Sequence, residues 1–417
     1  MAKRVVVTGI GVVSPIGNNV EDMWASIKAG KHGIGVVTRF DIEGSKAIMA
    51  AEVKDYDFGD KRAAKRLDRS NQMAITAARE AYKDAGLICG KEDDPADYNV
   101  DPNRFGVYGS TGIGGVTTFE NEVTKCVTKG NLNRGSAMLV PMMMPNAVAG
   151  NISMDLNAKG PSFCVSSACA TGTHAIGEAF RNIKFGYSDV VMAGSTESVL
   201  SPVAYSGFAN MTAMSSSEDP DRASIPFDKD RNGFVLGEGA GFVVLEELEH
   251  AKARGAKIYG EVIGYGASSD AYHITMPEPE GEGAARCMNL ALEEAGIAPE
   301  EISYINAHGT STPYNDKFET AAVKKVFGED TKVPMSSTKS MTGHLLGGAG
   351  GLEAVICAKA IEDGFIPPTV GLKNPDPELD LDYVPNEGRD ADLKYVMSNS
   401  LGFGGHNGSL IISKYEE

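Results

Sequence analysis

The sequence predicts an α/β fold built from two similar halves. Strand-like and helix-like segments alternate along the whole chain, which is typical of α/β proteins. The strand-like segments RVVVTGIG and RFGVYGS end in glycine, and the helix-like NQMAITAAREAYKDAGL has apolar or alanine positions at helical spacing up to Gly86. Glycine is frequent, at 49 of 417 residues, as expected where many tight turns occur.

The order of these segments recurs in the second part of the chain. VVVTGIG is matched by EVIGYG, the helix ending DAGL by LEEAGI, RFGVYGSTG by ISYINAHGT, and GEGAGFVVLEEL by FGGHNGSLIISKY. Strand–glycine–helix units are common in α/β proteins, but four matches in the same order favour internal duplication. We expect the halves to be residues 1–255 and 256–417. Residues 114–154 have no counterpart and are predicted to be an insertion that supplies an interface or a substrate channel.

Composition and charge narrow the classes of function. Hydrophobic residues make up 42% and charged residues 23%, as in ordinary soluble globular proteins. No segment reaches the roughly 18 apolar residues of a membrane-spanning helix. The start of the chain does not have the pattern of a signal peptide, so we expect a cytoplasmic protein. Lys and Arg number 39 against 56 Asp and Glu, a net charge of −17, which argues against nucleic-acid binding over a broad surface.

One of the six cysteines has an unusual setting. Cys169 lies in SSACATG, where nearly every neighbour is small, and the surrounding segment is predicted to form a short strand, a sharp turn and a helix. Unpaired amides and the helix dipole at a helix N-terminus stabilise a thiolate, which is the reactive form. From SSACATG alone, a nucleophile and a buried structural thiol remain equally open. The other five cysteines form no CxxC pair and indicate reduced, structural thiols.

Two of the seven histidines are predicted at loop tips beside glycine, where the sites of α/β proteins gather. His308 in YINAHGTSTPYND follows a strand, and His344 precedes a glycine-rich helix start. If the halves pack as pseudo-twofold mates, both loops reach the Cys169 turn. Zinc binding by this trio is a weaker alternative, because the sequence has no close ligand pairs. Lys339 and Glu353, on either side of His344, are expected to form a buried ion pair beneath the site.

Together these segments resemble the β-ketoacyl-[acyl-carrier-protein] synthases, the elongating condensing enzymes of fatty acid synthesis. SSACATG is similar to the family's active-site cysteine signature, NAHGTST to its first histidine motif, and STKSMTGHLLGGAGGLE to its block of lysine, second histidine and glutamate. FDKDRNGFVLGEGAG, SSDAYHIT and NSLGFGGHNGSLI also match, so the resemblance runs from residue 4 to about 415. It implies the thiolase-like duplicated fold, with two βαβ halves packed as five layers, α-β-α-β-α.

Within the family the motifs look most like synthase II, with synthase I and polyketide ketosynthases as the nearest alternatives. A non-catalytic chain-length partner would lack the cysteine, and a degradative thiolase would need a second catalytic cysteine. Ala170 follows the cysteine where synthase II chains often have threonine, which weakens the choice between synthases I and II. His406 stands where threonine is usual and bears on hydrogen bonding near the predicted gate.

The resemblance implies a decarboxylative Claisen condensation without a cofactor or metal. Cys169 would carry the acyl chain, and the amides of Cys169 and Phe403 would bind the oxyanion. His308 and His344, both neutral, would donate to the enolate oxygen of the malonyl substrate, while Lys339 tunes the local electrostatics. Phe403 is also expected to gate the site. The remaining predicted residues, on the substrate or in support of the site, are Thr310, Thr312, Phe208, Ile113, Thr275, Glu353 and Asp316.

The implied partners are acyl- and malonyl-loaded acyl carrier protein and a second copy of the chain, with residues 114–154 at the dimer interface. Because the carrier is acidic, the segment DKRAAKRLDRS is expected to dock it, with residues 62, 65, 66 and 69 on one face of a single helix. An ordinary solvated helix face is the alternative. The docking residues predicted on this basis are Lys61, Arg62, Lys65, Arg66 and Arg69.

Overall fold

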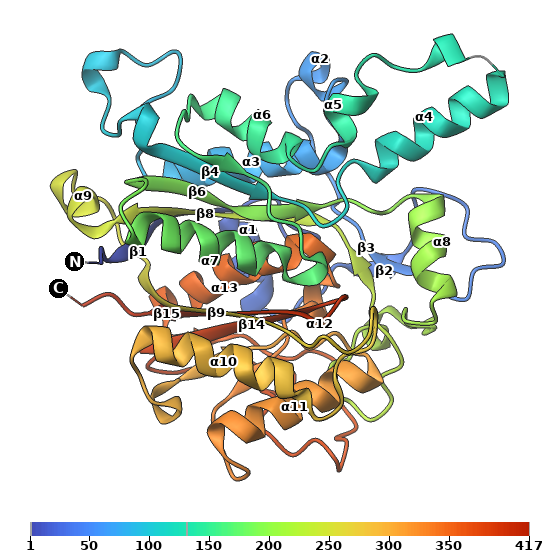
Figure 1. The fold of residues 1–417 in the computed structure, drawn as a ribbon. Coiled ribbons are helices and arrows are strands. Elements are labelled where there is room, and N and C mark those ends of the chain that lie inside the picture. Colours follow the sequence, from blue (N-terminus) through green and yellow to red (C-terminus); the bar gives the residue numbers. More distant parts are fainter. Residues whose placement is uncertain (1, 131, 417) are drawn as a thin grey trace.

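A computed structural model describes residues 2–130 and 132–416, and Figure 1 shows the five layers that the resemblance implies. The main sheet has ten strands in the order β11-β10-β14-β15-β9-β1-β8-β6-β4-β5. Its two parts lie in different layers, joined where residues 5–7 of β1 pair with residues 260–262 of β9. The expected five-layer α/β architecture is confirmed.

Both parts of the sheet repeat one pairing pattern. From the outer edge inward, β5-β4-β6 and β11-β10-β14 pair in parallel, and β6-β8-β1 and β14-β15-β9 pair antiparallel. This repeat is the duplication predicted from the order of sequence segments. The first part comprises β1 (Val5–Val13), β4 (Phe105–Ser110), β5 (Ser162–Phe163), β6 (Val190–Glu197) and β8 (Gly239–Glu247). The second comprises β9 (Gly260–Ser269), β10 (Tyr304–Asn306), β11 (Met335–Ser336), β14 (Tyr395–Gly402) and β15 (His406–Ser413).

Helices cover both faces of each part. The outer layers hold α3 (Arg69–Asp84) and α6 (Ala147–Leu156) on one side and α10 (Glu282–Ala295) and α11 (Pro313–Phe327) on the other. The middle layer holds α1 (Val20–Lys28), α7 (Thr171–Lys184) and α13 (Ala349–Asp363). Nearly every side chain of α13 is buried, as expected for a helix that is apolar all round. A Cβ at Gly241 of β8 would lie 2.2 Å from the Leu352 amide nitrogen, so glycine is what lets α13 approach the sheet.

Smaller elements complete the chain. The short strands are β2 (Ile34–Val36), β3 (Met49–Ala51), β7 (Leu236–Gly237), β12 (Phe365–Ile366) and β13 (Arg389–Asp390). The remaining helices are α2 (Lys61–Ala64), α4 (Val116–Lys129), α5 (Leu139–Met143), α8 (Pro202–Asn210), α9 (Leu248–Ala253) and α12 (Lys339–Thr342). The 3₁₀ turns are η1 (Pro95–Asp97), η2 (Pro102–Arg104), η3 (Leu132–Arg134), η4 (Ala168–Ala170), η5 (Pro220–Arg222), η6 (Pro279–Gly281), η7 (Pro299–Glu301) and η8 (Leu346–Gly348).

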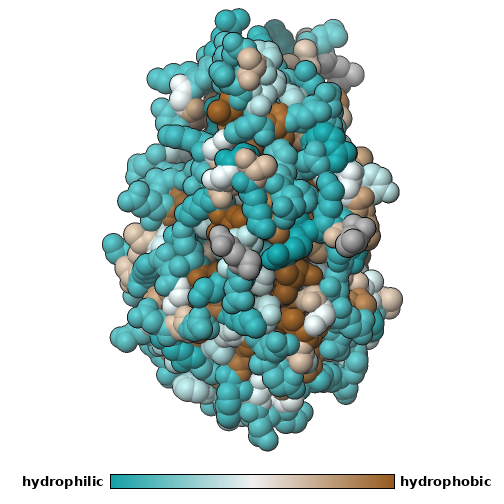
Figure 2. All heavy atoms as spheres, turned by 90° about the vertical axis from the view of Figure 1, so that its left-hand side faces the viewer, coloured by the Kyte–Doolittle hydropathy of each residue, from teal (hydrophilic) through white to brown (hydrophobic). Residues whose placement is uncertain are grey.

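The surface differs from one end of the molecule to the other. Residues 114–154 contribute α4 and α5, which project beyond the layers in Figure 1, and most of α6. Figure 2 shows the opposite end, beside the two termini, where hydrophilic atoms dominate and hydrophobic side chains gather in the middle of the face. Within the described part of the chain, no helix has both the length and the apolar character needed to cross a membrane.

Candidate active site

The Cys169 turn is built as the sequence predicts, between a short strand and a helix. β5 ends at Phe163, the turn η4 contains Cys169, and α7 begins at Thr171. Ala168 has a left-handed φ of 50°, which turns the chain sharply just before the cysteine. A Cβ at Gly172 would lie 2.4 Å from the Gly351 amide nitrogen, so the glycine lets α7 pack against the start of α13. The small residues therefore serve a tight turn and a close helix contact.

His344 lies directly beside the cysteine. Its Nε2 is 3.1 Å from the Cys169 Sγ, and its Nδ1 accepts a hydrogen bond from the Leu346 amide at 3.3 Å. Because Nδ1 accepts, the proton of a neutral His344 is on Nε2, and the N–H points at the sulfur. Burial, and then the charge of Lys339, lower the pKa of His344 well below its usual value. His344 is thus a hydrogen-bond donor to whatever occupies the position beside Sγ.

His308 faces the same space from the loop that follows β10. Its ring lies 5.3 Å from that of His344, centroid to centroid, and nearly perpendicular to it. Its position is fixed by Glu319 of α11, whose carboxylate accepts from the amides of His308 at 2.7 Å and Gly309 at 2.8 Å. Burial is the main reason that the pKa of His308 is lowered well below its usual value. Both imidazoles are therefore neutral at physiological pH.

The predicted ion pair of Lys339 and Glu353 is present and buried. Burial raises the pKa of Glu353 and the ammonium of Lys339 opposes this shift. The same ammonium lowers the pKa of Cys169, His308 and His344. Lys339 therefore acts electrostatically on all three candidate catalytic side chains.

The cysteine itself differs from the prediction of a stabilised thiolate. Cys169 is only 6% exposed, and burial raises the pKa of its thiol to about 12. Lys339 and the backbone amide of Phe403, which faces the sulfur, oppose this shift without overcoming it. Desolvation therefore favours the protonated thiol in the resting site.

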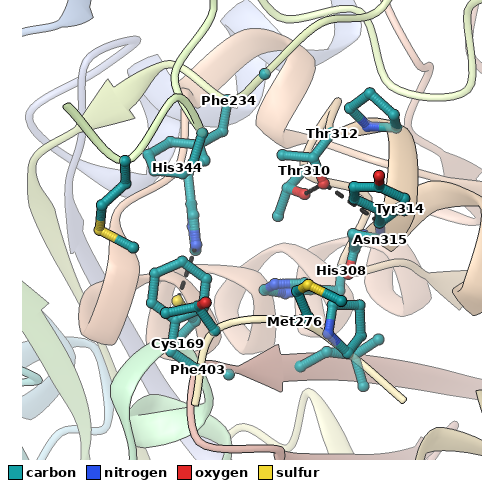
Figure 3. Close-up of a pocket in the computed structure, with 18 of the residues that line it drawn as sticks. Cys169, Phe234, Met276, His308, Thr310, Thr312, Tyr314, Asn315, His344 and Phe403 are labelled. Carbon is teal, nitrogen blue, oxygen red and sulfur yellow. Dashed lines mark hydrogen bonds between the residues drawn. The ribbon is translucent and has the colours of Figure 1, made fainter. Parts of the chain in front are cut away.

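Figure 3 shows the pocket onto which these residues converge, with a volume of about 430 Å³. Cys169, His344 and Phe403 lie together on one side of it, and the start of α11 forms the opposite side. Of the predicted substrate residues, Thr275, Thr310 and Thr312 line the pocket. Phe208 and Ile113 do not line it. Phe208 packs edge-on against Phe234, whose ring in turn contacts His344.

Other predicted residues have structural partners. Asp316 is fully buried and accepts from the amides of Phe227 at 2.9 Å and Ser311 at 3.2 Å, which brings the His308 loop against the segment before β7. Cys287 and Cys357 are fully buried in α10 and α13 and lie outside the pocket, so neither supplies the second catalytic cysteine of a thiolase. Within the described ranges, no three His, Cys, Asp or Glu side chains are grouped to hold a metal ion.

The predicted single docking helix is wrong. α2 ends at Ala64 and α3 begins at Arg69, because Asp60 and Asp68 each cap a separate helix N-terminus. The side chains of Lys61, Arg62, Lys65 and Arg66 are exposed. Arg69 instead turns inward to the buried carboxylate of Glu238, at 3.0 Å. We call the four exposed side chains the basic segment and leave Arg69 out of it.

Sequence reasoning missed three residues next to the site. Phe234 lies in the quoted motif FVLGEGAG, but nothing in the motif indicates its edge-on contact with His344. Glu319 and Glu197 are buried carboxylates that bind backbone amides of the site loops. The signal for Glu197 is a lone acidic residue at the end of the apolar strand VVMAGSTE.

Comparison with known proteins gives one consistent answer. Family models described as the N-terminal and C-terminal domains of beta-ketoacyl synthase match residues 2–251 and 259–373. The chain is 48% identical to 3-oxoacyl-[acyl-carrier-protein] synthase 2 of Synechocystis and 49% identical to that of Staphylococcus aureus, over 99% of each chain. It also matches a type II polyketide ketosynthase solved in complex with its acyl-carrier protein, with a TM-score of 0.92 and 34% identity over 100% of both chains.

Proposed function

The chain belongs to the β-ketoacyl synthase family, and from this premise we propose which of its residues carry out the reaction. It is an elongating enzyme of type II fatty acid synthesis, which condenses an acyl-[acyl-carrier protein] with malonyl-[acyl-carrier protein]. The products are CO₂ and a β-ketoacyl chain two carbons longer. The observation that supports the residue assignment is the contact of Cys169 Sγ with His344 Nε2 at 3.1 Å, with the His308 ring facing the same pocket.

In the first half-reaction Cys169 takes the acyl chain from the carrier. The sulfur attacks the thioester carbonyl and displaces the pantetheine thiol of the carrier, which leaves with the proton that Cys169 gives up, so one difficult transfer becomes two easier ones. The developing oxyanion is bound by the backbone amides of Cys169 and Phe403, the second of which already faces the sulfur. Phe403 lies between Gly402 and Gly404, and the left-handed φ of 86° at Gly404 requires glycine. This short loop is the gate that moves when the acyl chain enters.

In the second half-reaction the malonyl thioester loses CO₂ and becomes an enolate. Two neutral imidazoles on one pocket can both donate N–H bonds to the enolate oxygen, and such donors are stronger when charge develops in a dry site. The carbanion then attacks the acyl thioester on Cys169 and releases the product. Thr310 and Thr312, whose hydroxyls are 3.0 Å apart on the α11 side of the pocket, are suited to contact the malonyl-bearing arm.

Acyl carrier protein is the partner, and we propose that the basic segment docks it. The four side chains are exposed, and a local positive surface is needed because the enzyme has a net charge of −17. We also propose that residues 1–255 and 256–417 are the two ketosynthase halves, and that the enzyme works in the cytoplasm. The six cysteines, all free in the structure, suit a reducing compartment.

We propose a homodimer with residues 114–154 at its interface. Val127, Val140 and Met154 of this segment are 74%, 56% and 60% exposed, and Phe163 on the edge strand β5 is 54% exposed. An apolar surface next to an unpaired strand edge is stabilised when a second copy covers it. Analytical ultracentrifugation should give twice the 44.0 kDa chain mass, and a stable monomer at micromolar concentration would contradict the proposal.

The central test is the mass of the enzyme after reaction with acyl-carrier protein. We expect a single acyl adduct, absent in Cys169→Ala and discharged only when malonyl-carrier protein is added. The relative loading of palmitoleoyl and dodecanoyl donors begins to separate synthase II from synthase I behaviour. A folded wild-type enzyme that takes no adduct would overturn the assignment of Cys169 and favour a non-catalytic partner.

A further inference from the structure

A buried carboxylate lies behind the cysteine and is not used by the mechanism above. Glu197 ends β6 and is completely buried. Its Oε1 accepts from the Thr111 hydroxyl at 2.7 Å and the Ile113 amide at 3.4 Å. Its Oε2 accepts from the amides of Gly112 at 2.9 Å and Gly347 at 3.2 Å. These four donors are neutral groups, so the carboxylate serves to bind backbone rather than to form an ion pair.

The amides that Glu197 binds belong to two loops from different halves of the molecule. The first follows β4, and the second is the turn η8, which follows His344. The loops touch, since a Cβ at Gly347 would lie 2.3 Å from the Gly112 nitrogen and 2.8 Å from Glu197 Oε2. Neither loop could come this close with a side chain at that position. Glu197 therefore holds together two backbones that only glycine allows to meet.

These loops form the immediate surroundings of the nucleophile. The Ser166 hydroxyl, in the Cys169 turn, donates to the Gly112 carbonyl at 3.1 Å. Leu346, next to Gly347, lines the pocket and shares an apolar cluster with Cys169. An acyl chain attached to the sulfur must lie against this apolar cluster, because burying it there removes the chain from water. The spacing of the two loops thus determines where the acyl chain binds.

Glu197 also acts on the sulfur through its charge. Burial is the main reason that the pKa values of Cys169 and Cys164 are raised, and the negative charge of Glu197 raises both further. Burial raises the pKa of Glu197 itself to about 7, against the four hydrogen bonds that favour the charged form. As the pH falls through this pKa the carboxylate takes up a proton, and its charge effect on the Cys169 thiolate is lost.

We propose that Glu197 is a positioning residue that couples the binding position of the acyl chain to the reactivity of Cys169. Its carboxylate fixes the Gly112 and Gly347 loops on either side of the nucleophile, and its negative charge opposes release of the thiol proton. This role rests on the proposed function, because it presumes that Cys169 carries the acyl chain. His344 does not depend on Glu197 for its backbone position, which is fixed by hydrogen bonds with Val235 at 2.7 Å and Gly237 at 2.9 Å.

The matched control is Glu319, a second buried carboxylate whose pKa burial also raises to about 7. It binds the His308 and Gly309 amides on the opposite side of the pocket. Glu197→Gln should slow acylation of Cys169 by about tenfold, since hydrogen bonds to a charged group are lost, and leave decarboxylation of malonyl-carrier protein within about twofold. Glu319→Gln should have the reverse pattern. Equal losses in both half-reactions from Glu197→Gln would reduce its role to that of a scaffold.

Alkylation of Cys169 by iodoacetamide, corrected with Cys169→Ala, supplies a readout that a scaffold role would not move. At pH 8 Glu197→Gln should be alkylated faster than wild type, and at pH 6 the two rates should converge. Glu197→Asp keeps the charge but shortens its reach, so it should slow acylation without the faster alkylation at pH 8. Alkylation of Glu197→Gln at the wild-type rate at both pH values would overturn the charge effect and with it the proposal. A wild-type enzyme that takes no acyl adduct would instead overturn the proposed function.

Discussion

The same burial has opposite consequences for the reactivity of Cys169 and of the two histidines in the pocket. Burial removes charge from both, so it keeps His308 and His344 neutral and keeps the Cys169 thiol protonated. Neutral imidazoles are the form that donates to an enolate, whereas a protonated thiol is the weaker nucleophile. The two histidines are therefore in their reactive form before substrate binds, and Cys169 is not. Lys339 favours the reactive form of all three residues, because its charge lowers all three pKa values.

Removing Lys339 should therefore have the largest effect. Lys339→Ala leaves the carboxylate of Glu353 buried without its cation, which should lower the free energy of unfolding by about 3–5 kcal/mol. In the double variant with Glu353→Gln, most of this stability should return, while the pKa of Cys169 should still rise, because Lys339 lowers it more than Glu353 raises it. Denaturant unfolding and the alkylation rate of Cys169 at pH 8 measure the two effects separately. Wild-type rates of both half-reactions in folded Lys339→Ala would contradict the electrostatic role.

Replacing either histidine should separate the two half-reactions. His308→Ala and His344→Ala should each slow decarboxylation of malonyl-carrier protein by about 10²- to 10³-fold, since each removes one donor to the enolate oxygen. Only His344 contacts the sulfur, so only His344→Ala should also change the rate of Cys169 acylation. Single-turnover assays of each half-reaction, with the Cys169→Ala variant as background, make this measurement. Equal effects of both variants on acylation would show that the two histidines do not have separate roles.

Most of the fold can be predicted from the sequence, because the patterns that indicate it are local and occur twice. Strand, glycine and helix follow one another in the same order twice, and the repeated pairing pattern is the three-dimensional form of that order. Asp60 and Asp68 are also local signals, since each is an N-cap, and read as caps they divide DKRAAKRLDRS into two helices. The prediction of one helix followed charge spacing and overlooked the caps.

The site is only partly visible in the sequence because some of its determinants are not local. Cys169, His308 and His344 stand out by their small or glycine neighbours. The pKa of Cys169 does not, because the turn before a helix predicts a lowered value, whereas burial by distant segments raises it. Glu197 binds amides 85 and 150 residues away, and no spacing pattern links them. Contacts of this kind appear only in the folded chain, and the one with Gly347 appears only when the two halves are packed together.

The smallest effect is expected outside the pocket, at the basic segment. Arg62→Glu with Arg66→Glu should raise KM for carrier-bound substrates by about tenfold, because exposed charges steer and hold the acidic carrier without touching the reacting atoms. kcat and the reaction of a short pantetheine thioester should stay at wild-type values. The matched control is Lys83→Glu with Lys91→Glu, an equal change of charge at exposed positions at and beyond the far end of α3. An equal rise of KM in the control would trace the effect to net charge, and a loss with the short thioester would trace it to the fold. A rise of KM that is confined to the basic-segment variant and reduced by added salt would identify this segment as the carrier-binding surface. The same surface would then serve both half-reactions, acylation of Cys169 and decarboxylation of the malonyl substrate.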